Sequence, residues 1–235
     1  MYNKLSVLFI LFIIYSFLGW LMEVIGKLIE DRKFINRGFL IGPYCPIYGW
    51  GCILIINLLN KYIDHPIILF LMAIIICSTL EYLTSYLMEK IFNARWWDYT
   101  RRKFNLNGRI CLETMIPFGI LSTIVVYIIN PAILNFLNIF NVETINIIAT
   151  ILFILFIIDN IISINVINNV KNTINRLEKD QTEEITKKVK ELLLTKGILY
   201  KRIIKAFPTL KTYKERLIEL QNKISKEIEK INIKK

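Results

Sequence analysis

Five apolar stretches dominate this sequence, and each approaches the ~20 residues that a helix needs to cross a bilayer. The backbone of a chain in lipid must satisfy its hydrogen bonds internally, and the stretches are continuous rather than alternating, so they predict helices and not a β-barrel. We therefore expect an all-α, polytopic integral membrane bundle of five transmembrane helices, at Leu5–Gly26, Leu40–Asn60, Pro66–Met88, Ile110–Ile129 and Ile145–Ile167.

The placement of lysine and arginine predicts the orientation of these spans. Basic residues are dense after the first, third and fifth stretches and sparse at the opposite ends, with none between Pro131 and Glu143. The positive-inside rule then places the N-terminus outside and the C-terminus in the cytoplasm, as expected for a multi-pass protein of the plasma membrane. The net charge of +11 is mostly a topology signal. Nucleic-acid binding is not expected, because the charge lacks a separate soluble recognition module.

Two parts of the chain resemble each other. The segment "LMEVI" at Leu21–Ile25 matches "LMEKI" at Leu87–Ile91, "RKFINRG" at 32–38 matches "RKFNLNGR" at 102–109, and "CPIYG" at 45–49 stands opposite "IPFG" at 116–119. These matches predict a parallel internal repeat of residues 5–60 and 66–130. Each unit is a helix, a basic loop and a helix that contains Pro and Gly. Chance similarity between such short segments is the alternative.

The second and fourth stretches contain helix-breaking residues near the point where each helix should begin. Transporters often interrupt matching helices close to the substrate site, and the freed backbone groups then need partners in a protein-lined cavity. The alternative is that Pro and Gly are simply tolerated near helix ends and allow close helix packing. The candidate broken-helix positions are Gly42, Pro43, Pro46, Gly49, Pro117 and Gly119.

Five acidic residues lie in or near the predicted spans, where ionisable groups are costly and usually face a cavity. They are Glu23, Glu81, Glu89, Glu113 and Asp159. Glu81 shares one helix face with Ser78 and Ser85. We expect Glu81 and Asp159 to line a polar path or to form a buried network. The other three carboxylates are expected to pair at the interface with Arg37, Arg95 or Arg109.

The segment "ARWWDYTRRKFN" follows the third stretch. Its aromatic residues suit the headgroup layer, and we expect Asp98 to pair with Arg101 or Arg102. The basic loops are also candidates for docking a soluble partner. The candidate loop contacts are Arg37, Arg95, Trp96, Trp97, Asp98 and Arg109.

The character of the chain changes after Asn168, where lysine and glutamate alternate with Ile, Leu and Val. We divide the chain into a transmembrane domain, residues 1–168, and a basic cytoplasmic tail, residues 169–235. A spacing of three or four residues, broken once at Glu227, predicts an amphipathic or coiled-coil helix; the residues that follow it are Leu210, Tyr213, Leu217, Leu220, Ile224 and Ile231. Such a tail either lies on the anionic inner leaflet or contacts a second copy or a soluble partner.

Motifs for catalysis or cofactor binding are missing from the sequence. The pattern GxxxxGK[ST] does not occur, so the chain cannot hydrolyse ATP by that route. The four cysteines form no CxxC pair, and the single histidine, His65, lies on the predicted outer side, so a zinc site is not expected. We expect no catalytic residues, no metal and no cofactor on this chain, and predict that it is not an enzyme.

Four blocks of the sequence resemble a known family: "FLGW" at 17–20, "NRGFLIGPYCPIYGWG" at 36–51, "LEYLTSYLMEKIF" at 80–92 and "ARWWDYTRRKFNLNGRICL" at 94–112. They are similar to the signature blocks of a bacterial membrane family known as ABC-transporter type IV, or CmpB-like, which is common in Firmicutes. The similarity covers about residues 5–135. It implies a polytopic, permease-like protein whose ATPase is a separate chain.

The combined prediction is a transmembrane, permease-like subunit of a transporter, with membrane lipid around it and a separate ATP-binding subunit as a partner. A permease this small is expected to form a homo-oligomer. One alternative is a membrane scaffold or regulator that recruits partners through its helical tail. A further alternative is an intramembrane enzyme that acts on lipid.

Overall fold

The computed structural model describes residues 4–32, 34–36, 38–92, 94–177 and 211–212, and most of these residues are helical. The helical class predicted from the sequence is confirmed, because the described strands are only two residues long. In chain order the elements are α1 (Lys4–Asp31), α2 (Pro46–Leu59), the 3-10 turn η1 (Asn60–Tyr62), α3 (Pro66–Phe92), β1 (Ala94–Arg95), β2 (Asn105–Leu106), β3 (Ile110–Cys111), α4 (Leu112–Ile124), the π-helical η2 (Val125–Ile129), α5 (Asn130–Leu137), α6 (Val142–Leu177) and β4 (Lys211–Thr212).

Four helical segments are long and apolar enough to cross a membrane: Lys4–Glu30, Pro66–Phe92, Leu112–Leu137 and Val142–Asn168. They correspond to the first, third, fourth and fifth predicted spans, and each ends further along the chain than expected. The second predicted span differs. Its helical part, α2, has only 14 residues, which is about 21 Å of helix against a hydrocarbon core of ~30 Å.

Prolines set the point at which two helices begin. Pro46 lies in the first turn of α2, and Pro66 opens α3. The ring fixes φ near the helical value, and the missing N–H would have no acceptor within the helix at that position. The residues before Pro46 are therefore free to leave the helical conformation, and residues 38–45 are not helical.

The fourth predicted span is not interrupted where the sequence suggested. α4 continues through Pro117 and Gly119, because a proline in the second turn removes a single backbone donor and leaves the rest of the ladder intact. The irregular turn comes later, at the π-helical segment Val125–Ile129. Gly119 serves close packing instead, since a Cβ at this position would lie 2.6 Å from the Phe70 ring.

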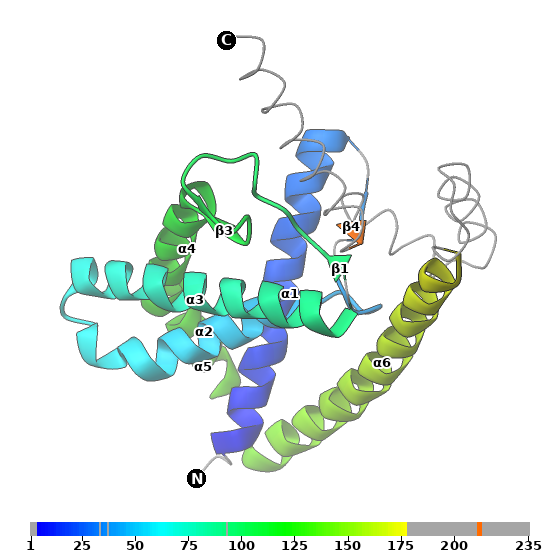
Figure 1. Cartoon of the computed structure of the whole chain (residues 1–235). Coiled ribbons are helices and arrows are strands. Elements are labelled where there is room, and N and C mark those ends of the chain that lie inside the picture. Colours follow the sequence, from blue (N-terminus) through cyan, green and yellow to red (C-terminus); the bar gives the residue numbers. More distant parts are fainter. Residues whose placement is uncertain (1–3, 33, 37, 93, 178–210, 213–235) are drawn as a thin grey trace, which may run out of the picture.

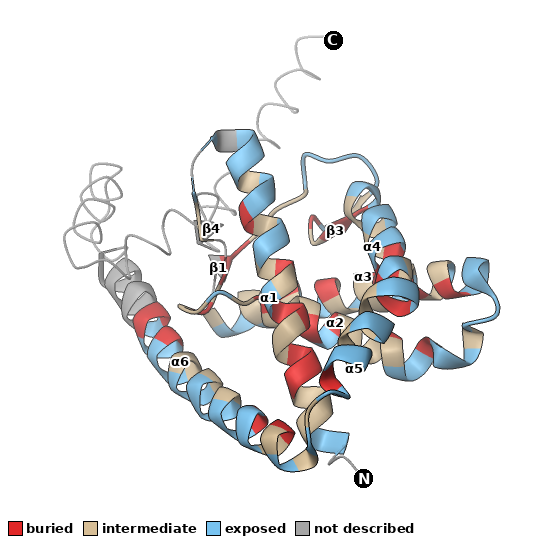
Figure 2. Ribbon diagram, turned by 180° about the vertical axis from the view of Figure 1, so that it is seen from behind, coloured by how far each residue is buried: buried red, intermediate tan, exposed pale blue. Residues whose placement is uncertain are grey.

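Helix α1 is central to the packing. The antiparallel α2–α3 hairpin crosses it steeply, and α6 lies along its other side (Figures 1 and 2). The α1 and α2 backbones approach closely at Gly49, where a Cβ would lie 2.6 Å from the carbonyl oxygen of Phe12. On the α6 side the Phe9 ring meets the Phe153 ring edge-on, with centroids 5.4 Å apart. Small residues and aromatic edges thus hold α1 in place.

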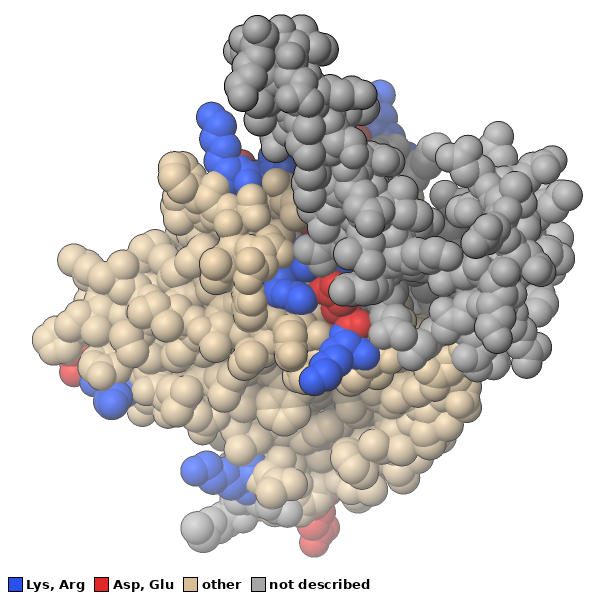
Figure 3. Space-filling view, in the orientation of Figure 1, with Lys and Arg blue, Asp and Glu red and all other residues tan. Residues whose placement is uncertain are grey.

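The outer surface is apolar. Large hydrophobic side chains are exposed along α3, α4 and α6, and Figure 2 shows exposed residues over most of the outward face of α6. Wide uncharged areas cover the helices in Figure 3, and the visible charges form small groups. A soluble monomer rarely exposes so much contiguous apolar area. Lipid is the environment that this surface fits, so the chain is built as a membrane protein.

The two predicted repeat units have the same order of elements but different helix contacts. Gly49 of α2 packs against Ser16 of α1, whereas Gly119 of α4 packs against Ile74 of α3. With the 66-residue offset between the matching "LMEVI" and "LMEKI" segments, Ser16 corresponds to Tyr82, which is about two helical turns from Ile74. The similarity of the two halves therefore does not extend to how their helices pack.

A short hairpin organises the α3–α4 loop, residues 93–111. Strands β2 and β3 pair antiparallel around Asn107 and Gly108, whose φ angles are 53° and 65°. Positive φ at both central residues defines a type I′ turn, for which Asn-Gly is the favoured pair. At the start of the loop, β1 pairs with β4 so that Ala94 lies opposite Thr212. The remainder of the predicted coiled-coil segment lies outside the described residues.

Candidate functional site: a cavity between the membrane helices

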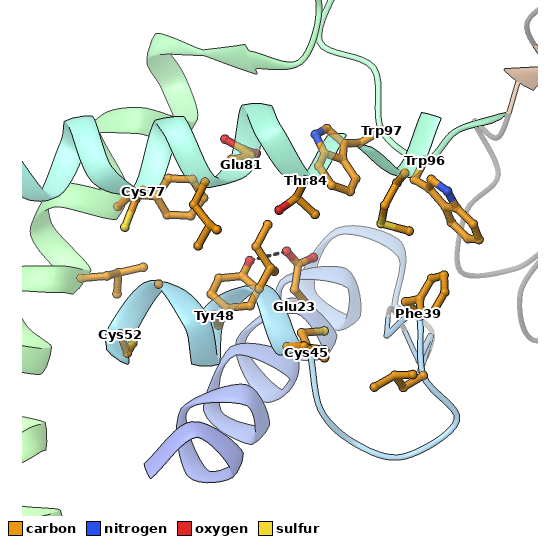
Figure 4. Close-up of a pocket in the computed structure, with 18 of the residues that line it drawn as sticks. Glu23, Phe39, Cys45, Tyr48, Cys52, Cys77, Glu81, Thr84, Trp96 and Trp97 are labelled. Atoms are coloured by element: carbon orange, nitrogen blue, oxygen red, sulfur yellow. Dashed lines mark hydrogen bonds between the residues drawn. The ribbon is translucent and has the colours of Figure 1, made fainter. Parts of the chain in front are cut away.

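A cavity of about 410 Å³ lies between α1, α2, α3, α4 and the α3–α4 loop. Figure 4 shows its lining: Glu23 comes from α1, Tyr48 and Cys52 from α2, and Cys77 and Thr84 from α3. Most of the lining surface is apolar, with a few polar groups. The volume is in the range of ~300–1,000 Å³ that is typical of small-molecule pockets. This cavity is the candidate functional site.

Aromatic rings close one end of the cavity. The Trp96 ring meets Phe39 and Phe92 with centroid distances of 5.4 and 5.9 Å, and all three side chains line the cavity. Trp96 is only 5 % exposed and packs against Val166 and Ile167 of α6. The sequence predicted a place in the headgroup layer for this tryptophan. Its ring instead fills the protein interior, because α3, α6 and the segment before α2 converge on it.

Two carboxylates line the cavity, Glu23 from α1 and Glu81 from α3. The Tyr48 hydroxyl of α2 donates to Glu23 Oε1 at 2.6 Å, the bond drawn in Figure 4. The Tyr99 hydroxyl, from the α3–α4 loop, donates to Glu81 Oε1 at 3.3 Å. Burial raises the pKa of the Tyr99 phenol, with the Glu81 carboxylate as the next cause. Tyr99 therefore remains a hydrogen-bond donor at neutral pH.

The hydrogen bonds of the Glu81 carboxylate are incomplete. It is 6 % exposed, and its Oε2 has no hydrogen-bond partner among the described residues. The same holds for the Oγ of Ser78, one turn earlier on the same helix face. A buried polar atom without a partner costs about 1–3 kcal/mol, and more when it is charged. Glu81 therefore brings to the edge of the cavity a buried acceptor that has no hydrogen bond among the described residues.

The segment before α2 is held by Asp159 of α6. The Ile41 N–H donates to Asp159 Oδ1 at 3.0 Å, the Gly42 N–H donates to Oδ2 at 2.7 Å, and the Tyr44 hydroxyl donates to the same carboxylate. The Cys45 N–H donates to the Ser16 carbonyl oxygen of α1 at 2.9 Å. Asp159 thus fixes the wall of the cavity without lining it.

A buried ion-pair network fixes the α3–α4 loop. Glu89 Oε2, at the end of α3, lies 3.2 Å from Arg95 Nη2 and 2.8 Å from Arg109 Nη2. Arg95 is 3 % exposed, and its Nη1 also reaches Asp98 at 3.4 Å. Asp98 therefore pairs with Arg95 rather than with Arg101 or Arg102. This network positions Trp96, Trp97 and Tyr99, which follow Arg95 directly and line the cavity.

The structure brings together only part of the predicted set. Of the predicted carboxylates, Glu23 and Glu81 reach the cavity, while Glu89 and Asp159 hold its surroundings. Glu113 lies on the exposed surface and pairs with Arg102 at 2.9 Å. Arg37 lies outside the described residues. Of the broken-helix candidates in the first half of the chain, Pro46 lines the cavity and Gly49 packs on α1. Gly42 donates its N–H to Asp159, and Pro43 follows it in the irregular segment. Helix α4 continues through the other two candidates, Pro117 and Gly119.

Sequence reasoning missed the tyrosines. Tyr48 and Tyr99 supply the hydroxyl groups that meet the two cavity carboxylates, and Tyr44 binds Asp159. A signal was available for Tyr48, because a tyrosine in an apolar helix needs a partner for its hydroxyl when it is buried. The pairing itself was not available, since it depends on how α2 is rotated against α1.

The described residues form no metal centre. Among them no group of three or more His, Cys, Asp or Glu side chains is arranged to hold a metal ion. Cys45, Cys52, Cys77 and Cys111 form no disulfide among the described residues. The polar groups of the cavity lining include carboxylates, hydroxyls, thiols and the Asn160 amide.

Comparison with known proteins gives one match. The sequence profile of a family described as "Putative ABC-transporter type IV" matches residues 10–164. The chain belongs to this family. The matched region contains every cavity residue named above and extends into α6, further than the blocks recognised in the sequence. No curated protein and no solved structure matches this chain.

Proposed function

We propose that this chain is the permease-like transmembrane subunit of a transporter, and that a separate subunit hydrolyses ATP for it. The observation that carries the proposal is the 410 Å³ cavity between the membrane helices, which is of the size and mixed polarity that suit a small organic molecule. Family membership supports it, since the family description names ABC transport. The lack of a P-loop motif in the sequence supports a second, ATP-binding chain.

We further propose that the chain crosses the plasma membrane of a bacterium five times, with the N-terminus outside. The short helix α2 makes the second crossing together with the irregular segment before it. Non-helical backbone is tolerated at membrane depth only where protein satisfies it. From Ile41 to Cys45 every backbone N–H has a protein acceptor, and Pro43 has no N–H. The N–H groups of this segment therefore have the protein acceptors that a place inside the bilayer needs, which supports the proposed crossing.

Reporter fusions test this topology. A phosphatase fused after Asp64, in the α2–α3 turn, is expected to be active because that turn lies outside. A fluorescent protein fused after Lys235 is expected to fluoresce because the C-terminus lies in the cytoplasm. An inactive phosphatase at Asp64 would show that α2 does not cross the membrane.

The central test of the function is purification of the tagged, full-length chain from its native membranes in a gentle detergent. We expect stoichiometric recovery of an ATP-binding subunit, and two copies of this chain in the complex, because one copy provides few helices to enclose a path. Reconstituted complexes are then assayed for ATPase activity. Recovery of the chain alone, or with an unrelated soluble protein, would contradict the transporter and favour a scaffold.

A Glu81→Gln variant further distinguishes the transporter from the scaffold. If Glu81 contacts the transported molecule, the Glu81→Gln substitution should lower the rate of transport while the complex still assembles. The matched control is Glu113→Gln, because Glu113 lies on the exposed surface away from the cavity. If deletion of residues 178–235 abolishes activity while Glu81→Gln has no effect, the tail rather than the cavity performs the function.

A further inference from the structure

We propose that the cavity binds a hydrophobic organic cation. The proposal rests on the transporter function above and names the class of its substrate. It is carried by the unbonded Glu81 oxygen, the charge of the lining and the aromatic wall. Each of these is a property of described residues.

The charge of the lining favours a cation. The described lining contains two carboxylates, Glu23 and Glu81, and no lysine, arginine or histidine. Glu81 is buried, and its described hydrogen bond from Tyr99 leaves Oε2 without a partner. Removing a carboxylate from water is costly unless a partner compensates for it. A bound cation supplies that partner, whereas a bound anion adds like charge to the same space.

The rest of the lining favours a hydrophobic body. Phe39, Phe92 and Trp96 form the aromatic end, Trp97 and Tyr99 continue it along the loop, and aliphatic and thiol side chains cover much of the remainder. Aromatic faces attract cations, and the attraction grows when water is excluded. A polyhydroxylated molecule such as a sugar would leave hydroxyl groups unpaired against this wall, at a cost for each of them.

The cavity is placed for exchange with the membrane. It lies between helices whose outer faces are apolar, and hydrophobic cations concentrate at membrane interfaces, where part of the molecule is in lipid and the charge is in contact with water. On the α6 side the cavity is lined by Asn160 of α6 and by the irregular segment that Asp159 holds.

Equilibrium dialysis with radiolabelled tetraphenylphosphonium tests the proposal. The full chain is placed in nanodiscs of phosphatidylcholine, a zwitterionic lipid, and empty nanodiscs give the background. We expect saturable binding of one cation per chain. Glu81→Gln should weaken it by roughly 10- to 100-fold, the range for losing a hydrogen bond or contact to a charged group. Glu113→Gln should leave it unchanged, since Glu113 is exposed and outside the cavity.

Two further measurements keep the test decisive where Glu81→Gln does not fold. Thr84→Phe keeps the charge but fills the cavity that Thr84 lines, and it should also abolish binding. Tetraphenylborate has the same shape with the opposite charge, and should not compete with the cation. The proposal is overturned if the wild-type chain shows no saturable binding, if both variants bind like wild type, or if the borate competes as well as the phosphonium.

The result is independent of the test of transporter function. Binding is measured on the purified chain alone, so it does not need the ATP-binding subunit. Recovery of that subunit without phosphonium binding would retain the transporter and reject this substrate class. Phosphonium binding without recovery of the subunit would retain the cation site and reject the ABC-type partner.

Discussion

Replacing Gly49 by alanine should destabilise the protein, while the same change at Gly51, two residues along the same helix, should not. At Gly49 the new Cβ would lie 2.3 Å from Ser16 Oγ and 2.6 Å from the carbonyl oxygen of Phe12. At Gly51 the nearest atoms would be Leu80 Cδ2 at 3.7 Å and Cys77 Sγ at 3.9 Å, which are ordinary contacts. The pair therefore compares the same chemical change with and without a collision.

The magnitude follows from which atoms can move. The Ser16 hydroxyl can rotate, but it would then give up its 2.7 Å bond to the Phe12 carbonyl, worth about 0.5–1.5 kcal/mol. The Phe12 carbonyl belongs to the α1 backbone, so α1 must withdraw by about 0.8 Å to restore a normal contact, which weakens dispersion across the whole helix pair. Overpacking of this kind costs about 1–3 kcal/mol. At Gly51 the gain in helix propensity, at most about 1 kcal/mol, should be retained.

The cysteines provide the assay. Cys45 and Cys111 are buried free thiols, so a thiol-reactive dye should report their exposure as the detergent-solubilised protein is heated. A loss of 1 kcal/mol lowers Tm by about 2–4 °C for a chain of this size. We expect a clear fall in Tm for Gly49→Ala and no fall for Gly51→Ala. Equal Tm values for the two variants would refute the close α1–α2 approach on which the cavity geometry depends.

Three further predictions use the same melting assay. Arg95→Gln should lower the free energy of unfolding by about 3–5 kcal/mol, because it leaves the largely buried Glu89 carboxylate with one cation fewer. Arg102→Gln, at an exposed ion pair, should change it by no more than about 1 kcal/mol. Equal effects of the two substitutions would contradict the network. Gly19→Ala should lower Tm, since its Cβ would lie 2.2 Å from the Tyr48 ring, and Gly26→Ala, with open space around it, should not. Asp159→Asn should lower the stability by about 1–2 kcal/mol, because a neutral amide replaces a charged acceptor of four donors; an unchanged Tm would show that Asp159 does not hold the segment.

The long helices were predictable because their signal is local. About twenty apolar residues in a row leave a membrane helix as the main option, and four such helices are present in the described part of the chain. Their ends were less predictable. The helical run of the fourth span continues through the π-helical segment Val125–Ile129 and past Pro131 to Leu137, the end of α5. Residue type alone does not distinguish a proline that ends a helix from one that lies within it.

The cavity was not predictable in the same way, because its residues meet through rotations and crossings of helices that hydropathy does not encode. The intramembrane carboxylates were a reliable sign of polar contacts, since each needs a partner. Which partner each one found depended on tertiary structure. Glu23 accepts a hydrogen bond from a tyrosine, and Glu89 forms ion pairs with two arginines. Asp159 accepts hydrogen bonds from backbone N–H groups that are available only because residues 38–45 are not helical.

This dependence gives the Gly- and Pro-rich segment before α2 a physical role. An intact helix through residues 40–45 would use its own N–H groups within the helix and would leave Asp159 without the donors at Ile41 and Gly42. The irregular segment instead turns these donors toward α6 and lets α2 begin at Pro46, with Tyr48 in reach of Glu23. The same departure from helical geometry therefore satisfies a carboxylate in α6 and positions a hydroxyl at the cavity.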